Sequence, residues 1–382
     1  TYGEAVETKA ADCVNPGENT YTCSVCPEGT DGHTKTETVK ALSHQYDDGV
    51  VTTDPTCTTA GEKTYTCTRV GCTAETSGHT KTETINALGH NYQNGTCANN
   101  CGATCPLTNE SGAFLLTSYE DLKWFANAVK EGLTTISAKQ TADITVGDDW
   151  EGIGTTDKRF AGTFDGGNHT VTFNGTKCLF AYAKGSSASE CVQIRNVVTA
   201  GNINGSAGIA EDATFALVEN CINRADVSND GIAAGIVGQG ARMQNQGAAL
   251  TVKNCGNEGD ITSTTSAPCA GILGHAQGNA TIEGCYNTGS ISGCAAEYTT
   301  SGVGGIAGYL QGYPGASQII NCYNGGTVTG GTVHGGLVGS FYNGVSVSNS
   351  YNAGQCEYGI MGSAFNDSPT LTNVYYLDTS CT

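Results

Sequence analysis

The chain has 382 residues, room for two or three domains, and only 14% of them are charged while 54 are glycine. Its formal net charge of −19 repels phosphate backbones, so nucleic acid is not expected as a partner. There is no run of about eighteen apolar residues, and we therefore expect no insertion into a membrane.

The first 108 residues contain a cysteine-rich repeat. Residues 1–50 form one copy, and residues 51–108 form a second copy followed by a truncated third. The two full copies lie about 45 residues apart, a spacing typical of stacked repeat units. The candidate metal ligands or disulfide partners are Cys13, Cys23, Cys26, His33 and His44 in the first copy, and Cys57, Cys67, Cys72, His79 and His90 in the second. Because the first copy lacks its opening histidine, we expect the chain to begin after a removed segment.

Turn residues predict how each copy folds. Pro16-Gly17 and Ala60-Gly61 lie midway between the first two cysteines of their copies, so we expect a hairpin that places those cysteines nearly opposite one another. With the third cysteine and a histidine, each copy would gather the Cys₃His ligands of a structural zinc site. The alternative is a cross-strand disulfide with one free thiol. Either cross-link replaces the core that so short a unit cannot build, and neither offers an open position for catalysis.

A third region, residues 109–382, begins where the composition changes. A helix is predicted over residues 117–131, from the capping box at Thr117–Glu120, an apolar stripe that includes Leu122 and Phe125, and the stop at Gly132. Short apolar runs with glycine turns follow, including Phe160-Ala-Gly-Thr-Phe-Asp165, and indicate strands. We expect the helix to cover the first of them.

Residues 207–377 repeat two phrases about every 30 residues. One phrase is Asn-Cys-Tyr-Asn or a close variant, and the other is glycine-rich, as in Gly335-Gly-Leu-Val-Gly339. Their alternating pattern is that of short strands, and such copies stack in parallel. The predicted fold is therefore all-β, a right-handed parallel β-helix with a short N-terminal capping helix, preceded by the small cysteine-rich hairpin units. A column of buried thiols with a structural role is expected from Cys221, Cys255, Cys285 and Cys322.

These phrases resemble the GLUG repeat of bacterial surface proteins, adhesins and accessory regions of secreted peptidases. The resemblance covers about the second half of the chain, and the cysteine-rich copies are similar to short repeats on the surface of gut Gram-positive bacteria. The resemblance implies a β-helix that presents other features. It does not imply a catalytic activity.

Catalytic chemistry is not expected. Polysaccharide cleavage needs two facing carboxylates or a base with a cation. The acidic side chains of the lead-in strands are the candidates, namely Asp143, Asp148, Asp149, Glu151, Asp157 and Asp165. In the later copies acidic residues recur at no common position. A solvated loop explains the cluster of Asp148, Asp149, Glu151 and Asp157 more simply than a catalytic site does.

Outward tyrosines are the candidate binding residues. A tyrosine that follows an inward cysteine points outward on an alternating strand, where it can stack on a sugar ring or another chain, or simply stiffen the sheet. The candidates are Tyr286, Tyr323, Tyr342 and Tyr351.

Together these features, with nineteen cysteines in all, predict a non-catalytic extracellular protein of a bacterial cell surface, a β-helical adhesin or spacer on cysteine-rich stalk units. Its expected partners are a host or environmental glycan or glycoprotein, or other copies of itself. The alternatives are a filament subunit that stacks end to end and a polysaccharide-cleaving β-helix. No catalytic cofactor is expected. Structural zinc is the metal that the cysteine-rich copies would hold, and calcium at the loop of Asp148, Asp149, Glu151 and Asp157 is a lesser alternative to a solvated loop.

Overall fold

The computed structural model describes residues 1–93, 95–241, 247–293, 302–312, 316–331, 333–365 and 368–378. The chain divides into two compact units, Thr1–Cys105 and Pro106–Thr382. The division falls within the change of composition at residues 104–109.

The first unit consists of small antiparallel sheets, one for each repeat copy. Their strands, in two sheets of three and one of two, are β1 (Val6–Lys9), β2 (Gly17–Thr22) and β3 (Thr34–Val39), then β4 (Val50–Thr53), β5 (Gly61–Thr66) and β6 (Thr80–Ile85), and finally β7 (Tyr92–Gln93) and β8 (Thr96–Cys97). The central strand of each full copy pairs with both neighbours. The copies are therefore equivalent in structure as well as in sequence.

The turn between the first two strands lies before the expected position. Gly17 begins β2, and a Cβ there would approach the Ala11 nitrogen to 2.5 Å and the Lys9 oxygen to 2.7 Å, so the turn needs glycine at this point. Cys13 lies in the turn, whereas Cys23 follows the far end of β2. A six-residue strand spans roughly 20 Å. The expectation that these two cysteines face each other was therefore wrong.

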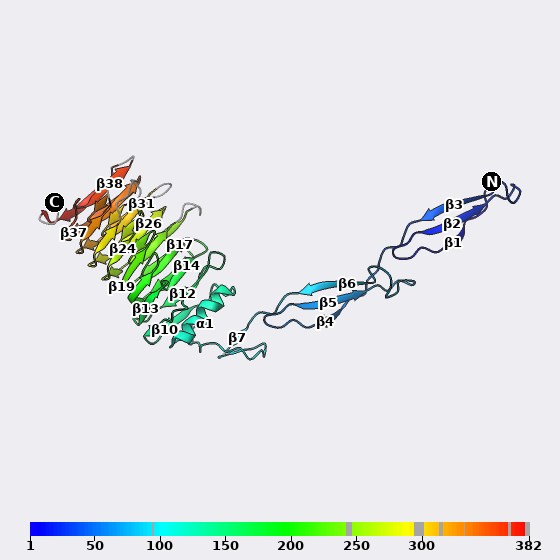
Figure 1. Ribbon diagram of the computed structural model, residues 1–382, viewed down its shortest axis with the longest axis horizontal. Helices are drawn as coiled ribbons and strands as arrows, with labels where there is room; N and C mark the ends of the chain where they lie inside the picture. Colours follow the sequence, from blue (N-terminus) through cyan, green and yellow to red (C-terminus); the bar gives the residue numbers. More distant parts are fainter. Residues whose placement is uncertain are drawn as a thin grey trace. The chain divides into compact units, whose positions relative to one another are not determined.

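The second unit is nearly all β and is built from parallel ladders, as Figure 1 shows. Its largest sheet contains β9 (Phe114–Leu116), β10 (Ala138–Gln140), β11 (Ile144–Thr145), β12 (Thr163–Asp165), β13 (Thr170–Thr176), β15 (Val192–Arg195), β16 (Val198–Asn204), β18 (Ala216–Glu219), β19 (Ile222–Asn229), β22 (Ala249–Lys253), β23 (Gly256–Asn257), β24 (Ile261–Ser263), β27 (Asn279–Glu283), β28 (Tyr286–Asn287), β29 (Ile291–Gly293), β32 (Ser317–Ile320), β33 (Tyr323–Asn324), β34 (Val328–Gly330), β37 (Val345–Asn352) and β39 (Thr370–Tyr376).

Two smaller parallel sheets complete this unit. The first has seven strands, β14 (Phe180–Lys184), β17 (Ala210–Thr214), β21 (Val237–Gly240), β26 (Leu273–Gln277), β31 (Ala307–Gln311), β36 (Val338–Tyr342) and β38 (Met361–Phe365). The second has four strands, β20 (Ala233–Ala234), β25 (Cys269–Ala270), β30 (Val303–Gly304) and β35 (His334–Gly335). Long parallel sheets of this kind are compatible with a β-helix.

The repeated phrases pair with one another in register. Tyr286 is opposite Tyr323, which is opposite Tyr351, and the glycine-rich strands pair in the same order. Aliphatic side chains lie inside at each level, for example Ile282 beside Ile319. Each copy therefore covers the apolar side of the next.

The helix α1 (Tyr119–Lys130) begins one residue later than the predicted capping box implies. Ser118 is its N-cap and accepts a hydrogen bond from the Asp121 amide, so Asp121 occupies the position expected for Glu120. The buried face is Leu122, Phe125, Ala128 and Val129. The Phe125 ring contacts Phe160 and Phe164, with centroids 5.7 and 6.1 Å away, so the helix packs on the lead-in strands. Within the described residues, no helix has the length and apolar character of a membrane span.

Candidate metal centres and the repeat core

Four potential ligands from two consecutive repeat copies meet at one place. Cys13 comes from the turn of the first copy, His44 from the linker, and Cys67 and Cys72 from the end of β5 in the second copy. The Cys13 and Cys67 sulfurs are 3.6 Å apart, and the Cys72 sulfur is 3.5 Å from the His44 Nδ1. The four ligand atoms all lie within 4.8 Å of one another.

A second cluster repeats the arrangement at the next joint, by which we mean the place where one repeat copy meets the following one. This cluster contains Cys57, His90, Cys97 and Cys101, which correspond in that order to Cys13, His44, Cys67 and Cys72 of the first cluster. The Cys57 and Cys97 sulfurs are 3.8 Å apart, and the Cys101 sulfur is 3.4 Å from the His90 Nδ1. In both clusters a tyrosine two residues after the histidine stacks on its ring, with centroids 5.6 Å apart for Tyr46 and 5.1 Å for Tyr92. Both clusters could hold a metal ion.

The ligand grouping differs from the one expected, because each cluster joins two copies instead of closing one. The cysteines of a copy lie at opposite ends of its central strand. The turn cysteine therefore lies beside the following copy, and the other two cysteines lie beside the preceding one. His33 and His79, also named as candidates, belong to neither cluster. Cys23 and Cys26 form a disulfide with each other. The repeat signal in the sequence was correct, but it did not reveal which copies share a site.

The cluster cysteines are also the core of the first unit. Among its described residues only Cys13, Gly17, Cys23, Cys57, Gly61, Cys67, Cys72 and Cys97 are buried. The apolar side chains Val6, Val50 and Leu88 are exposed. Since no aliphatic side chain is buried, the folded state of this unit depends on what joins the sulfurs.

The thiols of each cluster differ in acidity. Burial opposes ionisation of Cys67, but hydrogen bonds from the Arg69 and Gln45 amides, with those of Cys72 and His44, lower its pKa to about 6. Burial and the neighbouring thiols raise the pKa of Cys72 to about 12. In the second cluster the pKa of Cys97 is likewise about 6, and that of Cys57 about 11. One thiolate therefore forms readily, and a bound cation would remove the repulsion that resists the others.

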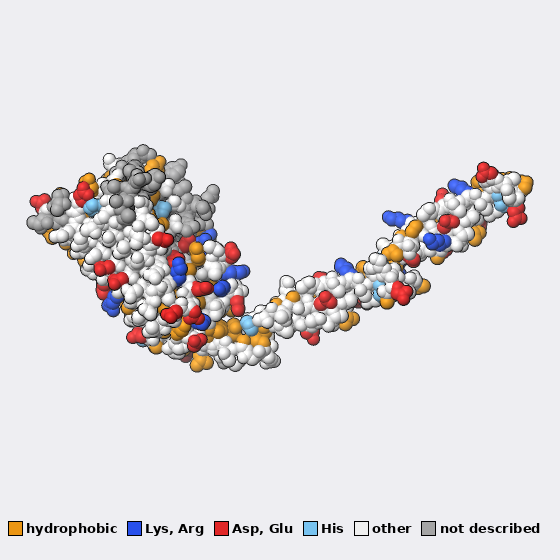
Figure 2. Space-filling model, viewed as in Figure 1, with side chains coloured by type: hydrophobic (Ala, Val, Ile, Leu, Met, Phe, Trp, Pro, Cys, Tyr) orange, Lys and Arg blue, Asp and Glu red, His pale blue; other side chains and the backbone are white. Residues whose placement is uncertain are grey.

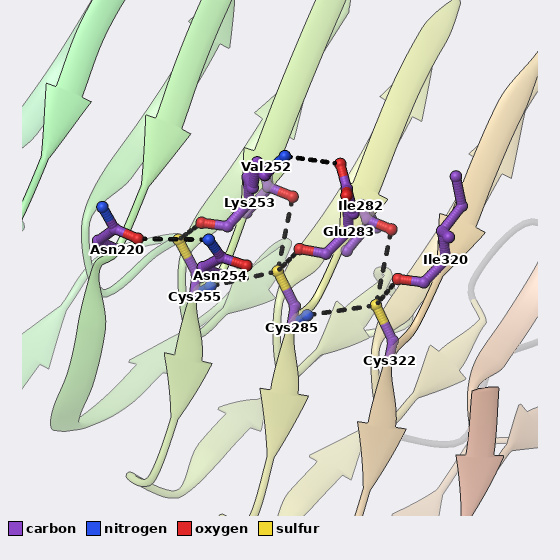
Figure 3. A network of polar contacts seen from close by, with 10 residues as sticks. All are labelled: Asn220, Val252, Lys253, Asn254, Cys255, Ile282, Glu283, Cys285, Ile320 and Cys322. Carbon is purple, nitrogen blue, oxygen red and sulfur yellow. Dashed lines mark hydrogen bonds and ion pairs between the residues drawn. The ribbon is translucent and has the colours of Figure 1, made fainter. Parts of the chain in front are cut away.

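The four cysteines of the expected column are buried in the second unit and are linked through their sulfurs. The amide of Cys221 donates to the Cys255 sulfur, and Cys255 and Cys285 donate in turn to the next sulfur, each at 3.4 Å. Figure 3 shows the part of this line from Cys255 to Cys322 and the bonds from these three thiols to nearby carbonyls. Ser350 continues it with its hydroxyl, which accepts from the Cys322 amide at 3.0 Å. All four side chains are at most 1% exposed.

A second buried column consists of asparagines, which the sequence analysis did not identify. The Asn223 side chain donates to Asn257, and the chain continues through Asn287, Asn324 and Asn352 at 2.7 to 2.8 Å. Each amide also donates to the carbonyl two residues later, as from Asn287 to Gly289. All five side chains are fully buried. Their polar groups are therefore satisfied inside the stack.

The glycine-rich phrase packs directly against this asparagine column. A Cβ at Gly235 would lie 2.4 Å from the Asn257 Oδ1, and one at Gly305 would lie 2.4 Å from the Asn324 side chain. Gly271 and Gly336 face Asn287 and Asn352 in the same way. The two repeated phrases are thus the two sides of one contact, which explains why they recur together.

The comparison with protein families agrees with this reading. The GLUG motif matches residues 299–329. One copy of the repeat thus carries the GLUG motif, and we call the copies that pair with it in register the GLUG copies. The match begins before β30, whose glycine-rich phrase it includes, and ends in β34 after the Asn-Cys-Tyr-Asn phrase. No sequence among the curated proteins matches the chain.

The predicted binding tyrosines of the GLUG copies stack mainly on each other. The rings of Tyr286 and Tyr323 lie 5.6 Å apart at 11°, and those of Tyr323 and Tyr351 lie 5.3 Å apart at 8°. Tyr286 also donates to Glu258 at 2.7 Å. Both faces of Tyr323 are covered, whereas Tyr351 is 47% exposed. Tyr342 lies in β36, in a different sheet. The geometry favours stiffening of the sheet over stacking on sugars.

Three of the six acidic residues of the lead-in strands lie beside a lysine or an arginine. A cavity of 370 Å³ beside α1 includes Lys123, Lys130, Asp149 and Glu151 in its lining. Asp149 accepts from Lys123 and Tyr119, and Glu151 is 3.3 Å from Lys130. The Asp165 carboxylate lies 3.6 Å from the Arg195 Nε. Asp143 accepts a hydrogen bond from the Thr170 amide. Asp148 and Asp157 are exposed. On the face drawn in Figure 2, acidic and basic side chains are scattered over these strands.

The asparagine column gives a test of what holds the GLUG copies together. Asn287→Ala removes the acceptor of one Asn257 N–H, removes one of the two donors to the Asn324 Oδ1, and takes the side-chain donor away from the Gly289 carbonyl. We expect the free energy of unfolding to fall by about 3 kcal/mol or more, since each buried polar group left unpaired costs about 1–3 kcal/mol. Both tryptophans, Trp124 and Trp150, lie in the second unit, so their fluorescence during denaturation reports on this unit alone.

Ser292→Ala is the matched control, because Ser292 is exposed on the neighbouring strand β29. It should change the stability by less than about 0.5 kcal/mol. Equal effects of the two substitutions would contradict a stabilising role for the column.

Proposed function

We propose that this chain is a non-catalytic extracellular protein of a bacterial cell surface, in which zinc-joined repeat units carry a right-handed parallel β-helix that acts as a spacer or an adhesin. The observation that carries the proposal is the pair of equivalent Cys₃His clusters, each placed between two consecutive copies. Linear arrays of this kind build length and stiffness. Nineteen cysteines and a net charge of −19 support an extracellular location and argue against a nucleic-acid partner.

The distances within the clusters favour zinc over disulfides. Zn–S bonds of about 2.3 Å and Zn–N bonds of about 2.0–2.1 Å in a tetrahedron put two sulfurs about 3.8 Å apart, and a sulfur and a nitrogen about 3.6 Å apart. In the two clusters the sulfur–sulfur distances are 3.6 and 3.8 Å, and the sulfur–nitrogen distances are 3.5 and 3.4 Å. A disulfide needs sulfurs about 2.05 Å apart. Four protein ligands close the coordination sphere, which makes the role of the metal structural.

The ladders of the second unit support a β-helix. Four consecutive copies each contribute strands to all three parallel sheets before the chain reaches the next copy, and parallel crossover connections are almost always right-handed. Packing of Phe125 on Phe160 and Phe164 supports a covering role for α1 at the first level. Such a stack is long, polar outside and rigid, as a spacer requires.

The zinc proposal predicts two metal ions per chain. Native mass spectrometry, with the Cys23–Cys26 disulfide intact, should count two zinc ions, and a chelator should remove them. Loss of metal should make residues 1–105 sensitive to protease without changing tryptophan fluorescence, because both tryptophans are in the other unit.

Variants separate metal from disulfide in the same measurement. Cys67→Ser should lower the count to one ion, and Cys105→Ser, which alters a cysteine outside both clusters, should leave two. A metal-free chain whose mass is lower by about four hydrogens, from two further disulfides, would contradict the proposal and support the disulfide alternative.

A spacer predicts a particular result in a glycan screen. Because the tyrosine faces are mostly covered, we expect no retention of the chain on immobilised mucin or on neutral and acidic glycans, and no release of reducing ends from the same panel. Retention that Tyr351→Ala abolishes and Tyr286→Ala preserves would identify an adhesin instead. Release of reducing ends would contradict a non-catalytic role.

A filament subunit is the second candidate, and the last strand favours it. In β39 and just after it, Leu371, Tyr375, Tyr376 and Leu377 are 48 to 65% exposed. Within the described residues β39 pairs with β37 alone. A parallel ladder with an open side offers amide and carbonyl groups to a further strand, which could come from another copy of this chain.

Assembly through this strand should depend on concentration. Light scattering of the wild-type chain should show an apparent mass that rises with concentration, and Leu371→Lys with Tyr376→Lys should hold the chain monomeric because edge charges oppose pairing. Val6→Lys, an exposed site in the first unit, is the control. A wild-type chain that stays monodisperse, without fibres in electron microscopy, would eliminate this candidate.

A further inference from the structure

Cys23 and Cys26 occupy, in the first copy, the place that Cys67 and Cys72 occupy in the second. The Cys23 amide donates to the His33 carbonyl at 2.8 Å, as the Cys67 amide does to His79. Each of the two cysteines, Cys23 and Cys67, also forms an antiparallel bridge with a tyrosine, to Tyr2 and Tyr46.

The tyrosines themselves are equivalent. Tyr2 donates to the Gly32 carbonyl and Tyr46 to the Gly78 carbonyl, both at 2.8 Å. Ser24 bonds the Thr1 carbonyl through its amide and hydroxyl, and Thr68 does the same with Gln45. The backbone around Cys23 therefore already has the form that a cluster requires.

The remaining ligands of such a cluster are the only part that differs. At the other two joints, a turn cysteine and a linker histidine of the preceding copy complete the set. Among the described residues, Cys23 and Cys26 have no such partners and form a disulfide with each other. Cys23 is buried, and the neighbouring Val25 and Tyr2 are 74% and 46% exposed. In the first copy the cysteine pair is thus closed as a disulfide and lies beside two exposed apolar side chains, Val25 and Tyr2.

We infer that Cys23 and Cys26, once reduced, are the acceptor half of a third metal site, which a further repeat unit of the same kind completes with one cysteine thiolate and one histidine imidazole. The inference rests on the proposed zinc sites and extends them to a joint between units. It identifies the partner by its chemistry, a turn cysteine and a linker histidine like Cys13 and His44. The same joint chemistry would then extend the array.

The disulfide controls whether this joint can form. A thiol reductant supplies two electrons and two protons, which convert the disulfide to two thiols while the reductant forms its own disulfide. Binding of zinc then displaces the two thiol protons and leaves two thiolates on the metal. In the oxidised form the sulfurs are bonded to each other and the half-site is closed to metal.

The first arm of the test counts metal in the wild-type chain. Oxidised protein should bind two zinc or cobalt ions, and reduction with a phosphine should add a third, weaker cobalt ion. Cys23→Ser with Cys26→Ser should bind two ions under both conditions. Fewer than two ions in the oxidised wild type would refute the proposed zinc sites. Two ions before and after reduction would overturn only the inference about the half-site.

The second arm tests the partner with a chain that has a free donor half. Cys97→Ser with Cys101→Ser releases Cys57 and His90 from their own cluster. With reductant and zinc, this variant should form head-to-tail oligomers in size-exclusion chromatography, and it should remain monomeric without either one. Adding Cys23→Ser and Cys26→Ser should abolish the oligomers. A monomeric donor variant with intact tryptophan fluorescence, or oligomers that persist in the fourfold variant, would overturn the inference.

Discussion

No repeat in this chain can bury a core of its own, so the stabilising contacts lie between one copy and the next. In the cysteine-rich unit the buried residues are cysteines and two glycines. In the GLUG copies, buried aliphatic side chains, asparagines and thiols all face their counterparts one level away. A single copy of either kind would expose most of what holds the array together.

The two halves of the chain meet this constraint with different chemistry. The GLUG copies use hydrogen bonds and packing repeated at every level, so the loss of one contact is shared by the neighbouring levels. Their asparagine column tolerates burial because the side-chain amides of Asn223, Asn257, Asn287 and Asn324 each donate to two carbonyl groups, one of the next asparagine and one of the backbone, and Asn352 donates to a backbone carbonyl and the Cys356 sulfur. In the cysteine-rich copies, the buried side-chain contacts between one copy and the next lie at one cluster of four potential ligands.

Much of this fold could be predicted from the sequence, since repetition is a strong signal. The spacing of the phrases predicted parallel stacking in register, and the register of Tyr286, Tyr323 and Tyr351 agrees with it. The helix was predicted over residues 117–131 and spans Tyr119–Lys130, and Leu122 and Phe125 lie on its buried face as the predicted apolar stripe requires. The second asparagine of each phrase was missed, because asparagine is a common turn residue and four of the five lie one or two residues before a glycine. Its burial is visible only when the next level is present.

The candidate metal sites were predicted in composition but not in grouping, and the reason is geometric. Spacing along the chain suggested that Cys13 and Cys23 share a hairpin, yet a six-residue strand separates them. Only the order of copies in space decides that Cys13 belongs with Cys67. A signal was available in the truncated third copy, which keeps His90, Cys97 and Cys101 but lacks the strands of a full unit. A truncated copy that keeps these three potential ligands but not a full three-stranded sheet must take the fourth from its neighbour, Cys57, so the truncation itself indicates a site shared between copies.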